Sequence, residues 1–153
     1  MQRIYTLLVE NKTGVLDRIV GLIRRYGWNI SSIVAAETEN PGFSIITIAV
    51  ACMSEIRIPD SSLRDLDFVK SVNVSKSSSP NLKEFLVARG KKGDFGALIG
   101  LALKSEEEAG IITAYWAGTN EEIADIQKEL AKNKDIILAR SGAIIMQKQM
   151  EVE

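Results

Sequence analysis

A short polar turn early in the chain has residue types that can hold a small carboxylate. Asn11, Lys12, Thr13 and Gly14 separate an apolar run from a segment whose apolar periodicity predicts a helix. The first N–H groups of a helix have no partner within the helix and lie at the positive end of its dipole. An anion is therefore well matched to this place. Gly14 lacks a side chain that would keep a ligand from the backbone, and Asn11 can both donate and accept hydrogen bonds.

The same turn also has a simpler explanation. Asn11 or Thr13 can cap the helix, and Asn-x-x-Gly alone is a weak signal. Asn29 adds a polar side chain at the start of the second predicted strand, which we expect to run close to this turn, where it could meet a ligand's amino group. Asn29 after Gly-Trp is nevertheless also an ordinary turn residue. The apolar residues that would frame a pocket beside it are Ile30, Ile33 and Ala36. These residues by themselves leave both interpretations open.

The composition removes several kinds of chemistry. The chain has 153 residues, of which 46% are hydrophobic and 25% charged, as in folded domains. Its 19 basic and 20 acidic residues give no overall field toward nucleic acid or a membrane surface. It has no histidine, and its single cysteine, Cys52, lies in an apolar stretch where we expect it to be buried. Zinc spacings, Cys/His or Ser/His/Asp nucleophile systems and an internal disulfide are therefore not expected.

The apolar runs are short. The opening run IYTLLV is shorter and more poorly flanked than a signal peptide, and no run reaches the roughly 18 residues that a membrane span needs. We therefore expect a cytoplasmic protein.

The first half of the chain predicts a ferredoxin-like sandwich. Apolar residues recur at helical spacing from Val15 to Ile23, and Gly27 provides a stop. The other predicted elements are strands at 3–10, 29–38 and 43–51, a short helix at 61–67 and a strand around Val72 and Val74. The resulting order is β-α-β-β-α-β, which defines an α+β fold.

The serine-rich segment 75–80 predicts a linker, so we expect a first domain at 1–75, a linker at 76–82 and a second domain at 83–153. The second domain partly repeats the order of the first. Its predicted elements are a strand at 83–90, a helix at 96–109, a strand at 110–118, a helix opened by a capping box of Thr119 and Glu122, and two strands broken at Ser141-Gly142. On this interpretation the second ferredoxin-like domain is abbreviated by one strand.

The stretch LLVENKTGVLDRIVGLIRRYGWNISSI resembles the amino-terminal ACT domain of the regulatory (small) subunit of acetolactate synthase. The residues that match this family's pattern without a gap are Glu10, Asn11, Gly14, Leu16, Arg18, Gly21, Leu22, Gly27, Asn29, Ile30 and Ser32. The hairpin residues that continue the match are Pro41, Ser44, Thr47 and Ile48. The run Ala139-Arg140-Ser141-Gly142 is similar to a turn near the family's carboxyl terminus.

The resemblance implies a regulatory subunit, not an enzyme. Such subunits form homodimers, activate the catalytic subunit of branched-chain amino-acid synthesis and make it sensitive to valine, which binds between two ACT domains. The cofactors of that enzyme, thiamine diphosphate, Mg²⁺ and FAD, would belong to the catalytic subunit. By matching position, Asn11 and Gly14 would hold the carboxylate, and Asn29 with Ile30 and Ala36 would complete the site from across the dimer interface. The implied ligand-binding residues are Asn11, Gly14, Val15, Asn29, Ile30 and Ala36. Ala35 stands where the family commonly has the larger valine.

Several positions differ from that family. Ile45 stands where arginine is common and Glu37 where proline is common, and Pro59 precedes a short second helix. A stand-alone ACT sensor that binds an amino acid without a synthase partner is therefore the alternative function.

An enzyme and an RNA-binding protein are two more distant alternatives. Asp94-Phe95-Gly96 has the letters of a kinase motif, but the chain has no His-Arg-Asp loop. The acidic run at 105–109 is better explained as a solvated helix end than as a pair of catalytic carboxylates. A ferredoxin-like RNA binder would need stacking aromatics on its central strands, for which only Tyr5 and Phe43 are candidates.

Overall fold

The computed structural model describes residues 2–51 and 60–145, which fall into two compact units. The first unit includes the described residues up to Asn81, and the second runs from Leu82 to Ile144. Cys52 and Pro59 lie outside the described residues, so the expected burial of Cys52 stays a prediction.

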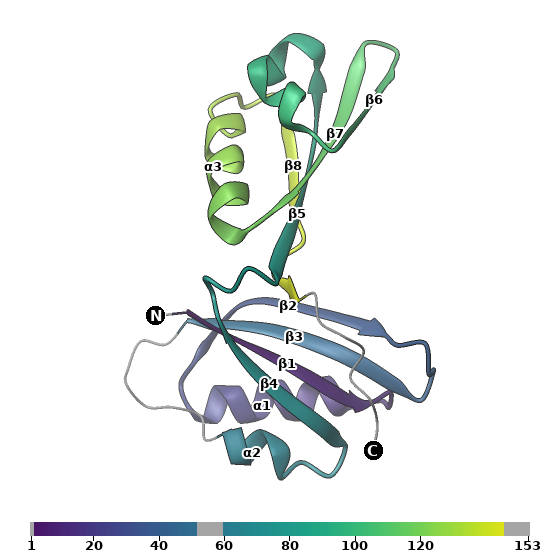
Figure 1. Ribbon diagram of the computed structural model, residues 1–153, viewed down its shortest axis with the longest axis vertical. Helices are drawn as coiled ribbons and strands as arrows, with labels where there is room; N and C mark the ends of the chain where they lie inside the picture. Colours follow the sequence, from purple (N-terminus) through teal and green to yellow (C-terminus); the bar gives the residue numbers. More distant parts are fainter. Residues whose placement is uncertain (1, 52–59, 146–153) are drawn as a thin grey trace. The chain divides into compact units, whose positions relative to one another are not determined.

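The first unit is a four-stranded antiparallel sheet with two helices (Figure 1). Its elements are β1 (Gln2–Glu10), α1 (Val15–Arg25), β2 (Asn29–Glu37), β3 (Phe43–Ala51), α2 (Asp60–Arg64) and β4 (Val69–Lys76). The strand order is β2-β3-β1-β4, so β1 and β3 are central and β2 and β4 are edges. The ferredoxin-like prediction for this half is confirmed.

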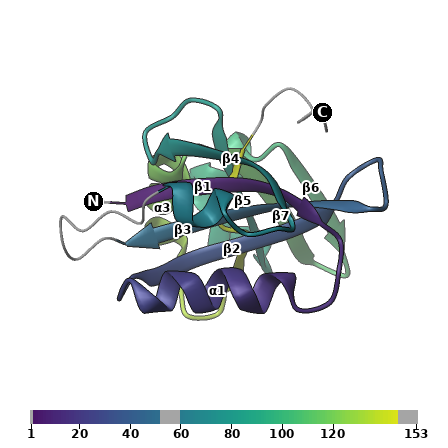
Figure 2. The same ribbon diagram turned by 90° about the horizontal axis from the view of Figure 1, so that it is seen from below.

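One face of the first sheet packs on α1, which lies along the sheet in Figure 2. Helix α1 buries Val15, Ile19 and Ile23, three residues at the spacing of one helical face. They join a core that contains Tyr5 and Trp28, whose ring centroids are 6.1 Å apart. The helix ends before Gly27, which has a φ of +68° and so provides the left-handed conformation of a helix terminus.

The second unit has the same strand order as the first. Its elements are β5 (Leu82–Lys91), a 3₁₀ segment η1 (Lys92–Leu101), β6 (Lys104–Glu108), β7 (Ile111–Gly118), α3 (Asn120–Leu130), β8 (Ile137–Arg140) and the short β9 (Ile144–Ile145). The strands lie in the order β6-β7-β5-β8, and β9 also pairs with β5. With η1 in the place of α1, and α3 in the place of α2, the β-α-β-β-α-β pattern is complete.

The predicted helix at 96–109 is therefore wrong, and the second unit does not lack a strand. Gly96 has φ 51° and ψ −137°, which interrupts the helical backbone within η1. Residues Lys104–Glu108 instead pair with Ile111–Tyr115 as the edge strand β6. Glutamate and lysine have good helix propensity, but a neighbouring strand supplies a full row of hydrogen bonds here. Pairing with β7 has overridden the local preference.

Helix α3 begins as predicted. Thr119 is its N-cap: the Thr119 hydroxyl accepts a hydrogen bond from the Glu122 N–H at 3.3 Å, and the Glu122 carboxylate accepts one from the Thr119 N–H at 2.7 Å. These bonds hold the pKa of Glu122 below its ordinary value, mainly through the Thr119 N–H and then through its hydroxyl. Within α3, the side chains of Ile123 and Leu130 are buried.

Candidate functional site

The turn after β1 ends in a glycine whose backbone is left-handed. Gly14 has a φ of +87° and is the N-cap residue of α1. No side chain of the described residues caps this helix end, so the capping that Asn11 or Thr13 could provide is absent there. A side chain placed on Gly14 would meet no atom within 4 Å. The start of α1 therefore offers backbone donors and open space, which is what a small anion needs.

Asn11 lies at the same end of the sheet and spans the tip of the β2–β3 hairpin. Its backbone N–H donates to the Gly42 carbonyl at 2.8 Å. Its side-chain amide nitrogen donates to the Glu37 Oε1 at 3.0 Å and to the Pro41 carbonyl at 3.2 Å. The last residue of β2 is thereby held against the turn that precedes α1.

Charge beside this turn is balanced by two lysines. The Glu10 carboxylate contacts the Nζ of Lys12 and the Nζ of Lys70, both at 2.7 Å. These hydrogen bonds, that of Lys12 first, lower the pKa of Glu10 from 4.5 to about 2. Glu10 is therefore ionised at neutral pH and is paired with both lysines.

Asn29 and Ile30 lie elsewhere in this protomer. Asn29 pairs with Ala51 at one end of the sheet, whereas Glu37 pairs with Ser44 at the other. Seven residues of strand, at about 3.3 Å each, separate Asn29 from Ala36 by about 23 Å. The expectation that the start of the second strand runs close to the first turn is wrong within one chain, because β2 runs from the far end of the sheet toward the turn.

The candidate residues therefore form two groups in each protomer. Asn11, Gly14 and the exposed Ala36 belong to the end of the sheet that carries the turn, and Asn29 and Ile30 belong to the opposite end.

Two of the candidates face the core. The Val15 side chain is buried, with 7% of its surface exposed, and its backbone N–H donates to the Lys12 carbonyl at 3.4 Å. Ile30 is half-buried and packs against the same core. Ala35 and Ala36 are both exposed on β2.

Strand β2 is an edge that carries apolar surface. Ile33 on β2 keeps 38% of its surface exposed, and Leu16 on the first turn of α1 keeps 42%. The free backbone groups of an edge strand can pair with a further strand, and exposed large apolar side chains favour a partner surface.

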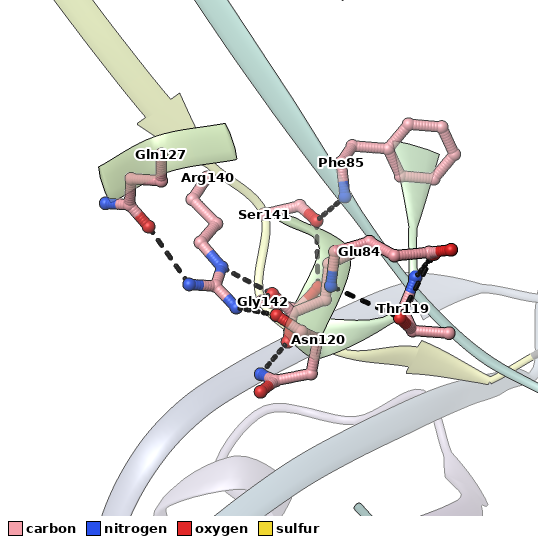
Figure 3. Close-up of polar contacts among 9 residues, drawn as sticks. Glu84, Phe85, Thr119, Asn120, Gln127, Arg140, Ser141 and Gly142 are labelled. Atoms are coloured by element: carbon pink, nitrogen blue, oxygen red, sulfur yellow. Dashed lines mark hydrogen bonds and ion pairs between the residues drawn. The ribbon is translucent and has the colours of Figure 1, made fainter. Parts of the chain in front are cut away.

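The second unit uses its polar residues for structure. Glu84 is buried, with 4% of its surface exposed, and forms an ion pair with Arg140 (Figure 3). The Asn120 amide donates to the Glu84 Oε1 at 2.8 Å, and the Arg140 Nη1 donates to the Gln127 Oε1 at 3.0 Å. Ser141 completes the turn by accepting from the Phe85 N–H at 3.0 Å. The Arg-Ser-Gly run thus ties β8 to β5 and α3.

The kinase-like run and one of the two candidate stacking aromatics have structural roles. Asp94 accepts a hydrogen bond from the Lys91 N–H at 2.8 Å, and Phe95 is buried with its ring 6.2 Å from that of Trp116. This kinase-like run is part of a turn and a core. Tyr5 is completely buried in the first core and has no surface for stacking on a base.

Within residues 2–51 and 60–145, no group of three or more His, Cys, Asp or Glu side chains is placed to hold a metal ion. In the same part of the chain, no helix is long and apolar enough to cross a membrane.

Comparison with known proteins gives the class of the first unit. Residues 6–58 match the AHAS small subunit-like ACT domain. The first unit thus contains an ACT domain, the class that its β-α-β-β-α-β order and its glycine turn indicate. Its match is to the ACT domain of acetolactate synthase (AHAS) small subunits.

Two relatives show the extent of the match. The acetolactate synthase isozyme 3 small subunit of Escherichia coli is 44% identical over 48 residues, which are 31% of this chain and 29% of that protein. The probable acetolactate synthase small subunit of Archaeoglobus fulgidus is 32% identical over 87 residues, which are 56% of this chain and 54% of that protein. The match thus spans about a third to a half of the length of these relatives.

A solved structure matches the fold of both units. The crystal structure of the acetolactate synthase small subunit from Thermotoga maritima superposes with a TM-score of 0.77 at 22% identity and covers 99% of each chain. At this identity the likeness shows the fold alone.

Proposed function

We propose that this chain is a non-catalytic regulatory subunit of acetolactate synthase, which activates a catalytic subunit and confers feedback inhibition by valine or another branched-chain amino acid. The observation that carries the proposal is the uncapped start of α1 at Gly14, within an ACT domain that matches those of the small subunits. There, backbone N–H groups offer a carboxylate the positive end of a helix.

A homodimer would bring the two groups of candidate residues together. Antiparallel pairing of two β2 edge strands about a two-fold axis would bring the start of one β2, with Asn29 and Ile30, beside the carboxyl end of the other, with Ala36. One chain cannot bring both groups of residues together, because they lie at opposite ends of β2. Asn11, Gly14 and Ala36 of one subunit would supply one side of the site, and the partner subunit would supply the other. The partner strand would also cover the exposed Ile33.

Regulation follows if the ligand binds one arrangement of the subunits better than another. A ligand held between two chains stabilises the arrangement that it fits, and this differential affinity shifts the population of the assembly. A catalytic subunit bound to the dimer would respond to that shift. Thiamine diphosphate, Mg²⁺ and FAD would be held by that catalytic subunit.

The first test is thermal unfolding of the purified protein with valine, leucine, isoleucine and unrelated amino acids at millimolar concentration. A ligand at about 100 times its dissociation constant adds about 2.7 kcal/mol, which is roughly 5 to 10 °C for a chain of this size. A shift with a branched-chain amino acid, and none with aspartate or lysine, supports the site. The absence of any shift contradicts it.

The partner is tested by co-expression with an acetolactate synthase catalytic subunit. Co-purification, with activity that falls when valine is added, supports the regulatory subunit. Binding of an amino acid without co-purification would instead favour the stand-alone sensor.

A further inference from the structure

The carboxyl end of β2 presents a carboxylate beside the proposed ligand site. Glu37 is exposed and accepts a hydrogen bond from the Asn11 amide at 3.0 Å. Among residues 2–51 and 60–145 it has no ion pair, although Lys12 and Lys70 neutralise the nearby Glu10. Of the two carboxylates near the turn, Glu10 is neutralised by lysines, whereas Glu37 has no ion pair among the described residues.

The contacts of Asn11 decide what its side chain can offer a ligand. Its amide nitrogen has two hydrogens, and both are used, toward the Glu37 carboxylate and the Pro41 carbonyl. An ionised carboxylate and a carbonyl can only accept hydrogen bonds, so the orientation of the amide is fixed by its partners. The polar atom that remains is Oδ1, which also can only accept.

Asn11 and Glu37 together thus present acceptors and a negative charge, next to a helix end that presents donors. We propose that this pair recognises the ammonium group of the ligand, while the ligand's carboxylate binds the start of α1. The inference rests on the proposed function and adds a specificity determinant to it. It also reverses the role that matching position implies for Asn11, from holding the carboxylate to holding the amino group.

The arrangement selects a zwitterion over a simple acid. An α-amino acid carries both charges that this site is proposed to bind: its ammonium group would pair with Glu37 and its carboxylate with the N–H groups after Gly14. A carboxylic acid without an amino group brings a second negative charge toward Glu37 and leaves the Asn11 Oδ1 without a donor. Discrimination between these two ligands therefore measures the contribution of the pair.

Calorimetric titration with valine and with 3-methylbutanoate, which has the same side chain but no amino group, tests this role. In the wild-type protein we expect valine to bind at least tenfold more tightly than 3-methylbutanoate. In Glu37→Gln we expect the valine affinity to fall about tenfold, which is typical for the loss of one hydrogen bond between charged groups. The affinity for 3-methylbutanoate should stay the same or increase, so the ratio of the two affinities should fall at least about tenfold.

Glu39→Gln is the matched control, because it removes an exposed acid in the same hairpin and should leave both affinities unchanged. Unfolding of each variant without ligand confirms that the fold is intact. Wild-type discrimination retained in Glu37→Gln overturns the inference but leaves the proposed amino-acid site in place. Failure of the wild-type protein to bind any branched-chain amino acid overturns both.

Discussion

The two units have the same strand order but differ at the turn that follows their first strand. After β1, the helix begins at Gly14 without a side-chain cap, and nothing lies within 4 Å of a side chain placed there. After β5, the Asp94 carboxylate accepts a hydrogen bond from the Lys91 N–H at 2.8 Å. Asp17 is the corresponding acid in the first turn of α1, but no side-chain hydrogen bond caps that helix end. The second unit thus uses its first-turn carboxylate as a cap, whereas the first unit does not.

The difference shows how one scaffold can serve two purposes. In the first unit the open turn lies beside an edge strand with exposed apolar residues, which suits a ligand and a second subunit. In the second unit the buried Glu84 is paired within the unit, in the network with Asn120 and Arg140. We therefore expect ligand binding to depend on the first unit and the largest polar contribution to stability to come from the second.

The largest expected effect is the loss of the buried ion pair. Arg140→Met leaves the Glu84 charge buried without its partner, which should lower the free energy of unfolding of the second unit by about 3 to 5 kcal/mol. Each unit contains one tryptophan, Trp28 in the first core and Trp116 in the second. Urea unfolding followed by fluorescence in a Trp28→Phe background therefore reports the second unit alone.

The control for this variant is Lys92→Met, which removes an exposed ion pair with Glu107 at 3.3 Å. Its expected cost is under about 1 kcal/mol. A Trp116→Phe background, in which Trp28 reports the first unit, should show a smaller effect of Arg140→Met. Equal costs for Arg140→Met and Lys92→Met would contradict the role given to the network.

A smaller effect should separate the capped helix from the uncapped one. Thr119→Ala removes the hydroxyl that accepts from the Glu122 N–H, so we expect a loss of about 1 kcal/mol in the same unfolding experiment. Thr13→Ala, just before α1, should change stability by less than about 0.5 kcal/mol because no side chain of the described residues caps that helix. If both variants cost the same, the contrast between the helix ends is wrong.

The smallest effect concerns the stability of the first unit at low pH. The folded pKa of Glu10, about 2, lies below its ordinary value of 4.5, so the ion pairs with Lys12 and Lys70 stabilise the fold above about pH 4.5. This contribution is lost as the pH falls from 4.5 through 2. In Lys70→Gln the pKa of Glu10 should rise toward its ordinary value, and the variant should be less stable than wild type at pH 6 but equal to it near pH 2.

Titration of the Glu10 carboxyl group by NMR measures that pKa directly, and unfolding at the two pH values measures its consequence. A pKa of Glu10 that does not change in Lys70→Gln would exclude this lysine as a cause of the shift.

The sequence predicted the elements whose patterns are local. The apolar run of β1, the periodicity of α1 with its glycine stop, and the capping box of Thr119 and Glu122 were all confirmed. The segment 104–108 was missed because its glutamates favour a helix, and only pairing with β7 makes it a strand. Such non-local hydrogen bonds leave no periodic signal in a short polar segment.

The same limit applies to the site. The turn at Asn11 and Gly14 could be found from residue types, because a glycine before an amphipathic helix is a local pattern. The contact between Asn11 and Glu37 joins residues 26 positions apart and depends on how the hairpin returns β3 beside β1. The only signal in the sequence was that Glu37 differs from the residue common in the resembled family.

The central claim, that the first turn holds a ligand carboxylate, is tested most directly by calorimetric titration of Gly14→Asp with valine. Asp at this N-cap position can cap α1 with its own carboxylate and tolerates a positive φ, so the variant should fold while its charge occupies the site. Gly14→Asn is the matched control, because asparagine also tolerates a positive φ but carries no charge. We predict that Gly14→Asp loses valine binding by at least about a hundredfold and that Gly14→Asn loses less. Wild-type affinity in Gly14→Asp would contradict the claim.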